Sequence, residues 1–194
     1  RAMKCGYIPD QFGHVTQTPQ ILNGFGIDTA FFARGTDSRE SASQLWWEAP
    51  DGSRVLAQNQ SYWNAAVAFR GEPKMELLDK VVEQHRAITH TNYLLFKNGC
   101  DHFLPFPGLP EVIADFNATR PHKMIHSGLE AFFSDLKVCD LSGIRVVVGE
   151  LNEGMQQCSN IGSLYNCGSS RIFNKQANRK CNIALEKWAE PFLA

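Results

Sequence analysis

Short apolar runs alternate along the chain with segments in which apolar residues recur at helical spacing. The runs typical of buried strands cover residues 3–8, 28–33, 93–96, 123–126 and 144–148. The spacing predicts helices over residues 19–24, 74–89, 109–117, 129–136 and 169–192. Two further strands, 44–48 and 54–58, flank the turn signal Asp51-Gly52 and predict a hairpin. Strands separated by helices indicate an α/β fold built from parallel β-α-β units.

Three irregular stretches, 35–43, 60–73 and 150–169, interrupt this alternation. Long loops on an α/β scaffold often build a substrate site. No internal repeat, low-complexity tract or linker divides the sequence. We therefore expect residues 1–194 to form a single domain.

Composition narrows the classes of partner. The 194 residues are 43% hydrophobic with a net charge of −1, which suits one globular domain and argues against a nucleic-acid partner. No run is long and apolar enough to span a membrane. The first ten residues lack the apolar region of a signal peptide, which favours a cytoplasmic location. The six cysteines form no CxxC pair, and nothing in the pattern indicates an oligomeric state.

Two acids lie where a predicted strand ends. Asp10 follows the strand over 3–8, and Asp101 follows the strand over 93–96. Because the carboxyl ends of parallel strands share one face, the two carboxylates are expected to meet there. Such a pair suits glycoside hydrolysis, in which one acid attacks the anomeric carbon and the other protonates the leaving oxygen. The alternatives are an ordinary strand–turn–helix joint for Asp10 and an Asx turn or helix cap for Asp101.

Other side chains could complete such a site. Arg34 follows the strand over 28–33, where its guanidinium could hold a carboxylate in place or be a surface charge. Aromatic residues that could form walls for a sugar, or belong to the core, are Trp46, Trp47, Tyr62 and Trp63. Of these, Trp47 and Tyr62 are candidate substrate contacts, together with His102 beside Asp101. His14 and His102 could also be metal ligands or structural histidines.

Four sequence blocks resemble glycoside hydrolase family 38, the α-mannosidases. In order they are GYIPDQFGHVTQTPQILNGFGIDTAFFARG, LWWEAPDGSRVL, LLFKNGCDHFLPFPGLPEVIADFN and SSRIFNKQANRKCNIALEKWAEPF. The Pro-Asp-x-Phe-Gly version of the first block is more similar to the bacterial and cytosolic-type branches. The resemblance implies a seven-stranded β/α barrel and a retaining α-mannosidase that acts on α-mannosides through a covalent intermediate. It also implies that Asp10 is the nucleophile and a zinc ligand, Asp101 the general acid/base, and Arg34 a contact of the nucleophile.

The chain lacks two motifs of that family, an early His-x-Asp and a later His-Asp, which supply further zinc ligands. The resemblance therefore implies an internal fragment of the catalytic domain, an incomplete barrel without its N-terminal strand and C-terminal part. Asp10 is then the only zinc ligand in the chain, whereas a catalytic zinc usually has about three protein ligands. We expect the isolated 194 residues to be inactive.

Two other interpretations remain open on the sequence. One is another barrel hydrolase, such as a family 57 glycosidase or a metal-dependent polysaccharide deacetylase. The other is a non-catalytic carbohydrate-binding protein. A covalent glycosyl adduct on Asp10 is expected only of a retaining glycosidase.

Overall fold

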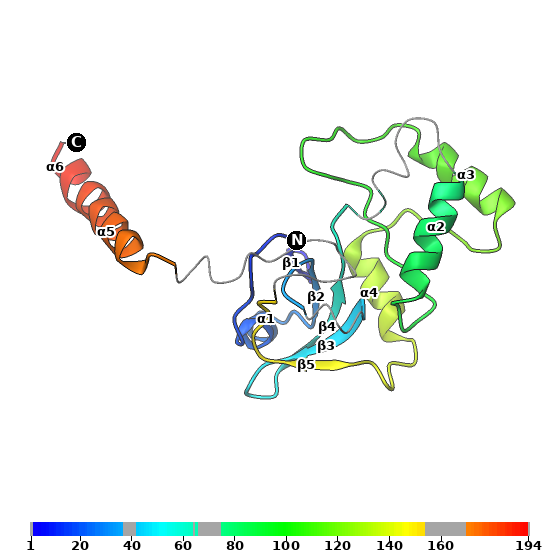
Figure 1. Cartoon of the computed structure of the whole chain (residues 1–194), viewed down its shortest axis with the longest axis horizontal. Helices are drawn as coiled ribbons and strands as arrows, with labels where there is room; N and C mark the ends of the chain where they lie inside the picture. The colour runs from blue at the N-terminus through cyan, green and yellow to red at the C-terminus, as the bar shows by residue number, and fades with distance from the viewer. Residues whose placement is uncertain (1, 37–41, 64, 66–74, 154–169, 194) are drawn as a thin grey trace. The chain divides into compact units, whose positions relative to one another are not determined.

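The computed structural model describes residues 2–36, 42–63, 65, 75–153 and 170–193. The chain divides into two compact units, Arg1–Ser163 and Leu164–Ala194 (Figure 1). That residues 1–194 form one domain stays a prediction. Most of the predicted loops 35–43, 60–73 and 150–169 lies outside the described residues.

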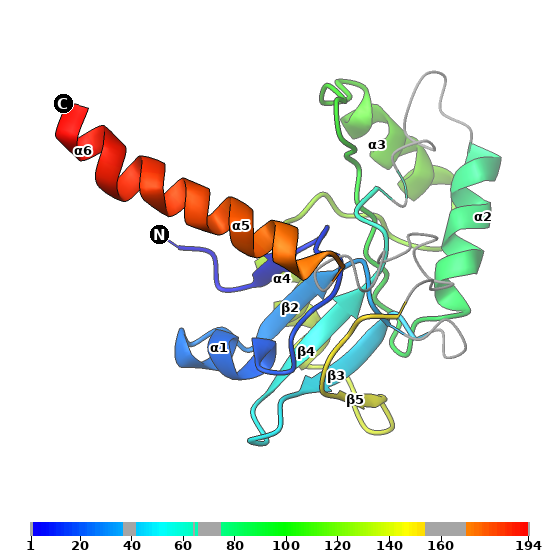
Figure 2. The same ribbon diagram turned by 60° about the vertical axis from the view of Figure 1, so that its left-hand side comes forward.

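A five-stranded mixed sheet forms the centre of the first unit. Its strands are β1 (Gly6–Ile8), β2 (Thr29–Phe32), β3 (Gln44–Glu48), β4 (Arg54–Asn59) and β5 (Val146–Val148). They lie in the order β1-β2-β4-β3-β5, with β3 and β4 antiparallel and the other neighbours parallel (Figure 2). The predicted hairpin and the first parallel β-α-β unit are confirmed. The described strands form an open sheet, so the seven-stranded barrel stays a prediction.

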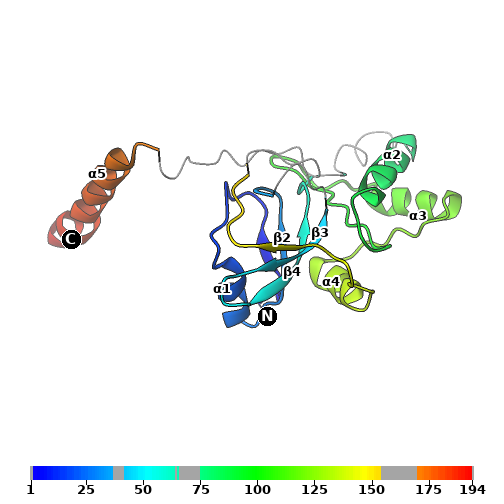
Figure 3. The ribbon, with the colours of Figure 1, turned by 60° about the horizontal axis from the view of Figure 1, so that its bottom comes forward.

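The described residues of this unit form four helices, and each was predicted within a few residues. They are α1 (Thr18–Gly24), α2 (Met75–Arg86), α3 (Leu109–Thr119) and α4 (Leu129–Lys137). Helices α2 and α3 pack on each other through a cluster that includes Leu78 and Phe116, apart from the sheet (Figure 3). No helix in the described ranges combines the length and apolar character that crossing a membrane requires.

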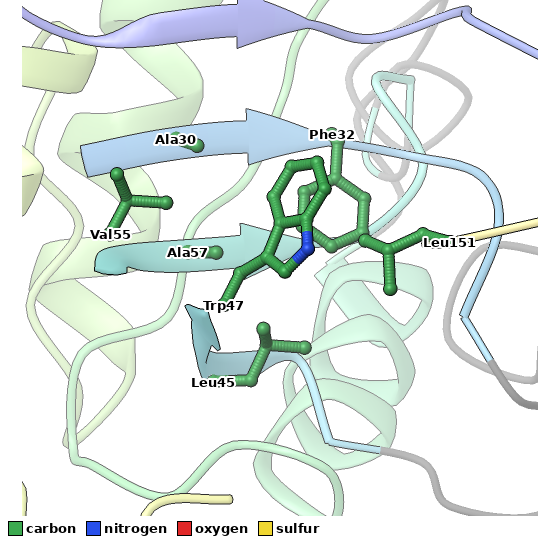
Figure 4. Packing of buried hydrophobic residues seen from close by; sticks show 7 residues of the cluster. All are labelled: Ala30, Phe32, Leu45, Trp47, Val55, Ala57 and Leu151. Atoms are coloured by element: carbon green, nitrogen blue, oxygen red, sulfur yellow. The ribbon is translucent and has the colours of Figure 1, made fainter. Parts of the chain in front are cut away.

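Alternation along β4 places α1 and α4 on opposite faces of the sheet. Val55 and Ala57 belong to the cluster that Leu22 of α1 covers, whereas Leu56 packs with Phe132 of α4. The buried members of the first cluster are Ala30, Phe32, Leu45, Trp47, Val55, Ala57 and Leu151 (Figure 4). This packing fixes the strands whose carboxyl ends carry the candidate site.

Two predicted strands are wrong. Residues 93–96 form no strand, because Gln44 Nε2 donates to the Tyr93 carbonyl and Gln60 Nε2 to the Leu95 carbonyl. Residues 123–126 form none either, because the side chain of Asn117 pairs with both the amide and the carbonyl of Met124. In both segments, side-chain amides take the place of a neighbouring strand.

The second unit is one helical rod. It comprises α5 (Ile172–Ile183), the π-helical stretch η1 (Ala184–Ala189) and α6 (Glu190–Leu193), close to the predicted span 169–192. None of these helical residues is buried within the described structure, and Phe173, Trp188 and Phe192 are exposed.

Candidate active site

Four side chains meet at the carboxyl ends of neighbouring parallel strands. Asp10 lies two residues beyond β1, Arg34 two beyond β2 and Tyr62 three beyond β4. Because β1 pairs with β2, and β2 with β4, all in parallel, their carboxyl ends share one edge of the sheet. Asp101 reaches the same place from the turn that follows residues 93–97. The structure therefore brings both predicted acids and the predicted arginine together.

Arg34 holds Asp10 by a single carboxylate oxygen. Its Nε lies 2.8 Å and its Nη2 2.5 Å from Asp10 Oδ1. The guanidinium also lies over the ring of Phe12, 4.6 Å from the centroid. The Arg34 side chain is 12% exposed and that of Asp10 51%. Within the described part of the chain, Asp10 Oδ2 accepts no hydrogen bond, so this oxygen remains open to a ligand.

The Tyr62 hydroxyl connects the two acids. It lies 3.3 Å from Asp10 Oδ1 and 3.5 Å from Asp101 Oδ2. These two carboxylate oxygens therefore cannot be farther apart than the two contacts placed end to end. Burial, followed by the negative charges of Asp10 and Asp101, raises the pKa of Tyr62 to about 12. The hydroxyl therefore keeps its proton at neutral pH and can donate to a carboxylate.

His14 is a structural residue that holds the loop carrying Arg34. Its backbone pairs with Leu151 in both directions, at 2.8 and 3.0 Å. Its ring is 7% exposed, packs edge-on against Phe32 and Trp47, and lies with Nε2 3.2 Å from the Arg34 carbonyl. Burial lowers the pKa of His14 to about 4, and a carbonyl only accepts, so the neutral ring donates from Nε2. Of the interpretations open for His14, the structure supports the structural one.

Gly35 makes this arrangement possible. Its φ is +98°, and a Cβ built there would lie 2.4 Å from the Leu151 carbonyl oxygen. The Gly35 carbonyl accepts from the Glu153 amide at 3.1 Å. The backbone of 151–153 therefore lies against the loop that carries Arg34 only because residue 35 has no side chain.

Lys97 is a cation that the sequence analysis did not single out. Its ammonium lies 4.9 Å from the ring centroid of Tyr7 and 5.1 Å from that of Phe31, and burial lowers its pKa. The pKa of Tyr7 is raised by burial and by the charge of Asp101. Lys97 and Asp101 therefore lie near the same ring. The signal that could have found Lys97 is its position at the end of the apolar run 93–96.

The two remaining predicted substrate contacts have different outcomes. Trp47 is 0% exposed, and its Nε1 donates to the Gly149 carbonyl at 2.8 Å. Since no surface of this ring is available to a sugar, the predicted contact is wrong and Trp47 is a core residue. His102 is exposed beside Asp101, with a left-handed φ of 63°. Its contact with a substrate stays a prediction.

The described residues do not by themselves fit a catalytic zinc ion. Among them, no three His, Cys, Asp or Glu side chains lie close enough together to hold a metal. Asp10 could supply one ligand, whereas such a site usually needs about three.

Comparison with known proteins relates this geometry to a family. The model of the glycosyl hydrolases family 38 N-terminal domain matches residues 1–142. A protein of Halalkalibacterium halodurans named "Putative mannosylglycerate hydrolase" is 31% identical over 203 residues, covering 96% of this chain and 22% of that protein.

Two solved structures are similar as well. An alpha-mannosidase from Enterococcus faecalis V583 matches with a TM-score of 0.70 and 26% identity, over 78% of this chain and 18% of that one. A family 38 protein from Enterococcus faecalis, at 23% identity and a TM-score of 0.57 over 76% of this chain and 15% of that one, shows the fold alone. This chain spans less than a quarter of the length of each of these relatives. The match over residues 1–142 shows that the chain belongs to glycosyl hydrolase family 38.

Proposed function

We propose that the whole protein is a retaining α-mannosidase and that this chain carries its acid pair. The observation that carries the proposal is the Tyr62 hydroxyl, which reaches an oxygen of Asp10 at 3.3 Å and one of Asp101 at 3.5 Å. Retaining glycosidases hold their carboxyl groups about 5–5.5 Å apart, and inverting ones about 6.5–9.5 Å. The two contacts placed end to end give the largest possible distance between the contacted oxygens of Asp10 and Asp101. This upper limit lies above the whole retaining range and only slightly above the lower bound of the inverting range. Their limit on the separation of the acids therefore favours retention.

Asp10 is the proposed nucleophile. Arg34 binds Oδ1, and within the described residues Oδ2 accepts no hydrogen bond, so the carboxylate is held in place with one oxygen available to attack. In the first step, a bond forms between Asp10 and the anomeric carbon while the bond to the leaving oxygen breaks. That oxygen takes the proton of Asp101, which acts as the general acid.

Asp101 is the proposed base of the second step. It takes a proton from water, the water oxygen attacks the anomeric carbon, and the bond to Asp10 breaks. The sugar leaves with its original configuration, Asp10 is again a carboxylate and Asp101 is again protonated. Exposure of both acids in the described structure gives substrate and water access to them.

Zinc is the proposed cofactor of the whole protein, on the basis of the resemblance to α-mannosidases. Asp10 would be its one ligand from the described residues, and the remaining ligands would come from elsewhere. A bound zinc ion would orient sugar hydroxyls.

The test is α-mannoside hydrolysis by the whole protein and its Asp10→Asn variant. We expect the variant to lose activity by several orders of magnitude while its thermal unfolding temperature changes little, because Asp10 is half exposed. Activity retained in Asp10→Asn would contradict the assignment. Binding of mannose without turnover by the whole protein would instead favour the carbohydrate-binding interpretation. Membership of family 38 replaces the family 57 and deacetylase interpretations.

A second candidate substrate is mannosylglycerate, an α-mannoside with a carboxylate on its aglycone. The similarity over 96% of this chain to a protein named for that hydrolysis favours it. An anionic aglycone needs a cation near the general acid. Lys97 lies over the ring of Tyr7, and the charge of Asp101 raises the pKa of the same tyrosine. Lys97 is therefore the candidate cation. Comparison of kcat/KM for mannosylglycerate and for a neutral aryl mannoside distinguishes the two substrates.

A further inference from the structure

The Tyr62 hydroxyl lies within hydrogen-bond distance of two carboxylates. Its distances to Asp10 Oδ1 and Asp101 Oδ2 are nearly equal, 3.3 and 3.5 Å. A phenolic hydroxyl has one proton, so it donates to one of these oxygens at a time. A tyrosine hydroxyl ordinarily ionises at about pH 10, so below pH 8 it keeps that proton whichever acid carries the charge.

The proposed reaction moves one negative charge between these same acids. Before the first step Asp10 is ionised and Asp101 is protonated. After that step Asp10 is a neutral ester and Asp101 has become a carboxylate, because its proton left with the aglycone. Each state therefore presents one anion within reach of the Tyr62 hydroxyl, on alternating sides.

We propose that Tyr62 is a shared donor whose hydrogen bond turns from Asp10 to Asp101 as the charge moves, an inference that rests on the proposed function. No proton leaves Tyr62, and no bond of the tyrosine forms or breaks apart from this hydrogen bond. Rotation about the phenolic C–O bond is sufficient to turn the hydroxyl hydrogen from one carboxylate oxygen to the other. Tyr62 is thus a positioning residue that stabilises the ionised form of each acid in turn.

The ring is held in place independently of its hydroxyl. It packs edge-on against Trp63 with centroids 4.5 Å apart, and the Trp63 amide donates to Ser61 Oγ at 3.3 Å. Tyr62→Phe therefore removes the donor and retains the ring contact. Tyr93→Phe is the matched control, because Tyr93 is 42% exposed and its hydroxyl contacts neither acid in the described structure.

The experiment isolates the second step. The whole protein is treated with a fluorinated mannosyl fluoride that leaves a slowly hydrolysed adduct, excess reagent is removed, and recovery of activity is followed from pH 4 to 8. In the second step negative charge leaves Asp101 and develops on Asp10, so the hydrogen bond that lowers the barrier is the one to Asp10 in the transition state. Because Tyr62→Phe lacks this donor, it should recover about 10–100-fold more slowly than wild type. The pH profile of its recovery should differ from that of the wild-type protein, because the pair of acids has lost its shared donor. Tyr93→Phe should match wild type within about twofold.

Each failure has a different meaning. If wild type forms no adduct, the proposed function fails and the shared donor fails with it. If adducts form and Tyr62→Phe recovers with the wild-type rate and pH profile, only the shared donor is overturned. A crystal structure of the trapped wild-type protein needs no variant. The hydroxyl should lie nearer to Asp101 than to Asp10, and the opposite order would overturn the proposal.

Discussion

Protonation of His14 should destabilise the fold as the pH falls. The ring is buried and neutral, with a pKa lowered from 6.5 to about 4, so below pH 6.5 the unfolded chain binds a proton that the folded chain refuses. At pH 7 the unfolded and folded chains bind almost the same number of protons at His14. At pH 5 the difference in proton binding lowers the free energy of unfolding by about 2 kcal/mol, and below pH 4 by about 3 kcal/mol, from about 1.36 kcal/mol for each pKa unit.

Urea unfolding at pH 7 and pH 5 measures this loss of stability. Tryptophan fluorescence can follow the unfolding, because the ring centroids of His14 and Trp47 lie 5.4 Å apart. His14→Gln keeps a donor for the Arg34 carbonyl and does not titrate. The stability difference between wild type and His14→Gln should therefore shrink by about 2 kcal/mol at pH 5. His126→Gln, at an exposed position, is the control and should keep the wild-type dependence. An unchanged difference between wild type and His14→Gln at the two pH values would refute the burial argument.

Three further variants test the close packing at Gly35, the core position of Trp47 and the proposed role of Lys97. Gly35→Ala should lower the free energy of unfolding by more than about 3 kcal/mol, because the added Cβ would lie 2.4 Å from the Leu151 carbonyl oxygen. Thermal or urea unfolding measures this loss. Wild-type stability in the variant would contradict the packing of residues 151–153 against Gly35. Trp47→Phe should lower the free energy of unfolding by about 2–3 kcal/mol, because the Gly149 carbonyl loses its donor. The KM of the variant should equal that of wild type. A raised KM would indicate that Trp47 contacts the sugar after all. Lys97→Met should lower kcat/KM for mannosylglycerate about tenfold more than kcat/KM for a neutral aryl mannoside. An equal loss of kcat/KM for both substrates would show that Lys97 does not recognise the carboxylate.

Local signals account for the elements that the sequence predicts well. The turn residues Asp51-Gly52 specify the β3–β4 hairpin, and Pro19 lies in the first turn of α1. The segment 93–96 is apolar enough for a strand, but its partners are the side chains of Gln44 and Gln60. Such long-range pairing by amides leaves no periodic trace, so the strand prediction fails there.

The site shows the same division. Position at strand ends was enough to bring Asp10 and Arg34 to one edge, because parallel neighbours align those ends. Asp101 reaches the same edge although residues 93–96 form no strand, so its predicted place is right and the reason given for it is wrong. Trp47 was misassigned because an aromatic cluster does not reveal which face each ring takes. Alternation could have indicated it, since Trp47 shares a face with the apolar Leu45 in the core cluster.

The role of the Tyr62 hydroxyl could not be predicted from sequence. Tyr62 lies in an irregular segment beyond β4, and its place between two acids depends on the conformation of that segment. The sequence indicates an aromatic near the site, whereas only the structure indicates what its polar end contacts.

The anomeric configuration of the first product tests the retaining mechanism, because the two Tyr62 contacts limit how far apart Asp10 and Asp101 can lie and so favour retention. Hydrolysis of an aryl α-mannoside by the whole protein can be followed by proton NMR before the product mutarotates. With a retaining mechanism, α-mannose appears first and β-mannose only later. Appearance of β-mannose first would mean inversion and would contradict the assignment of Asp10 and Asp101 as a retaining pair.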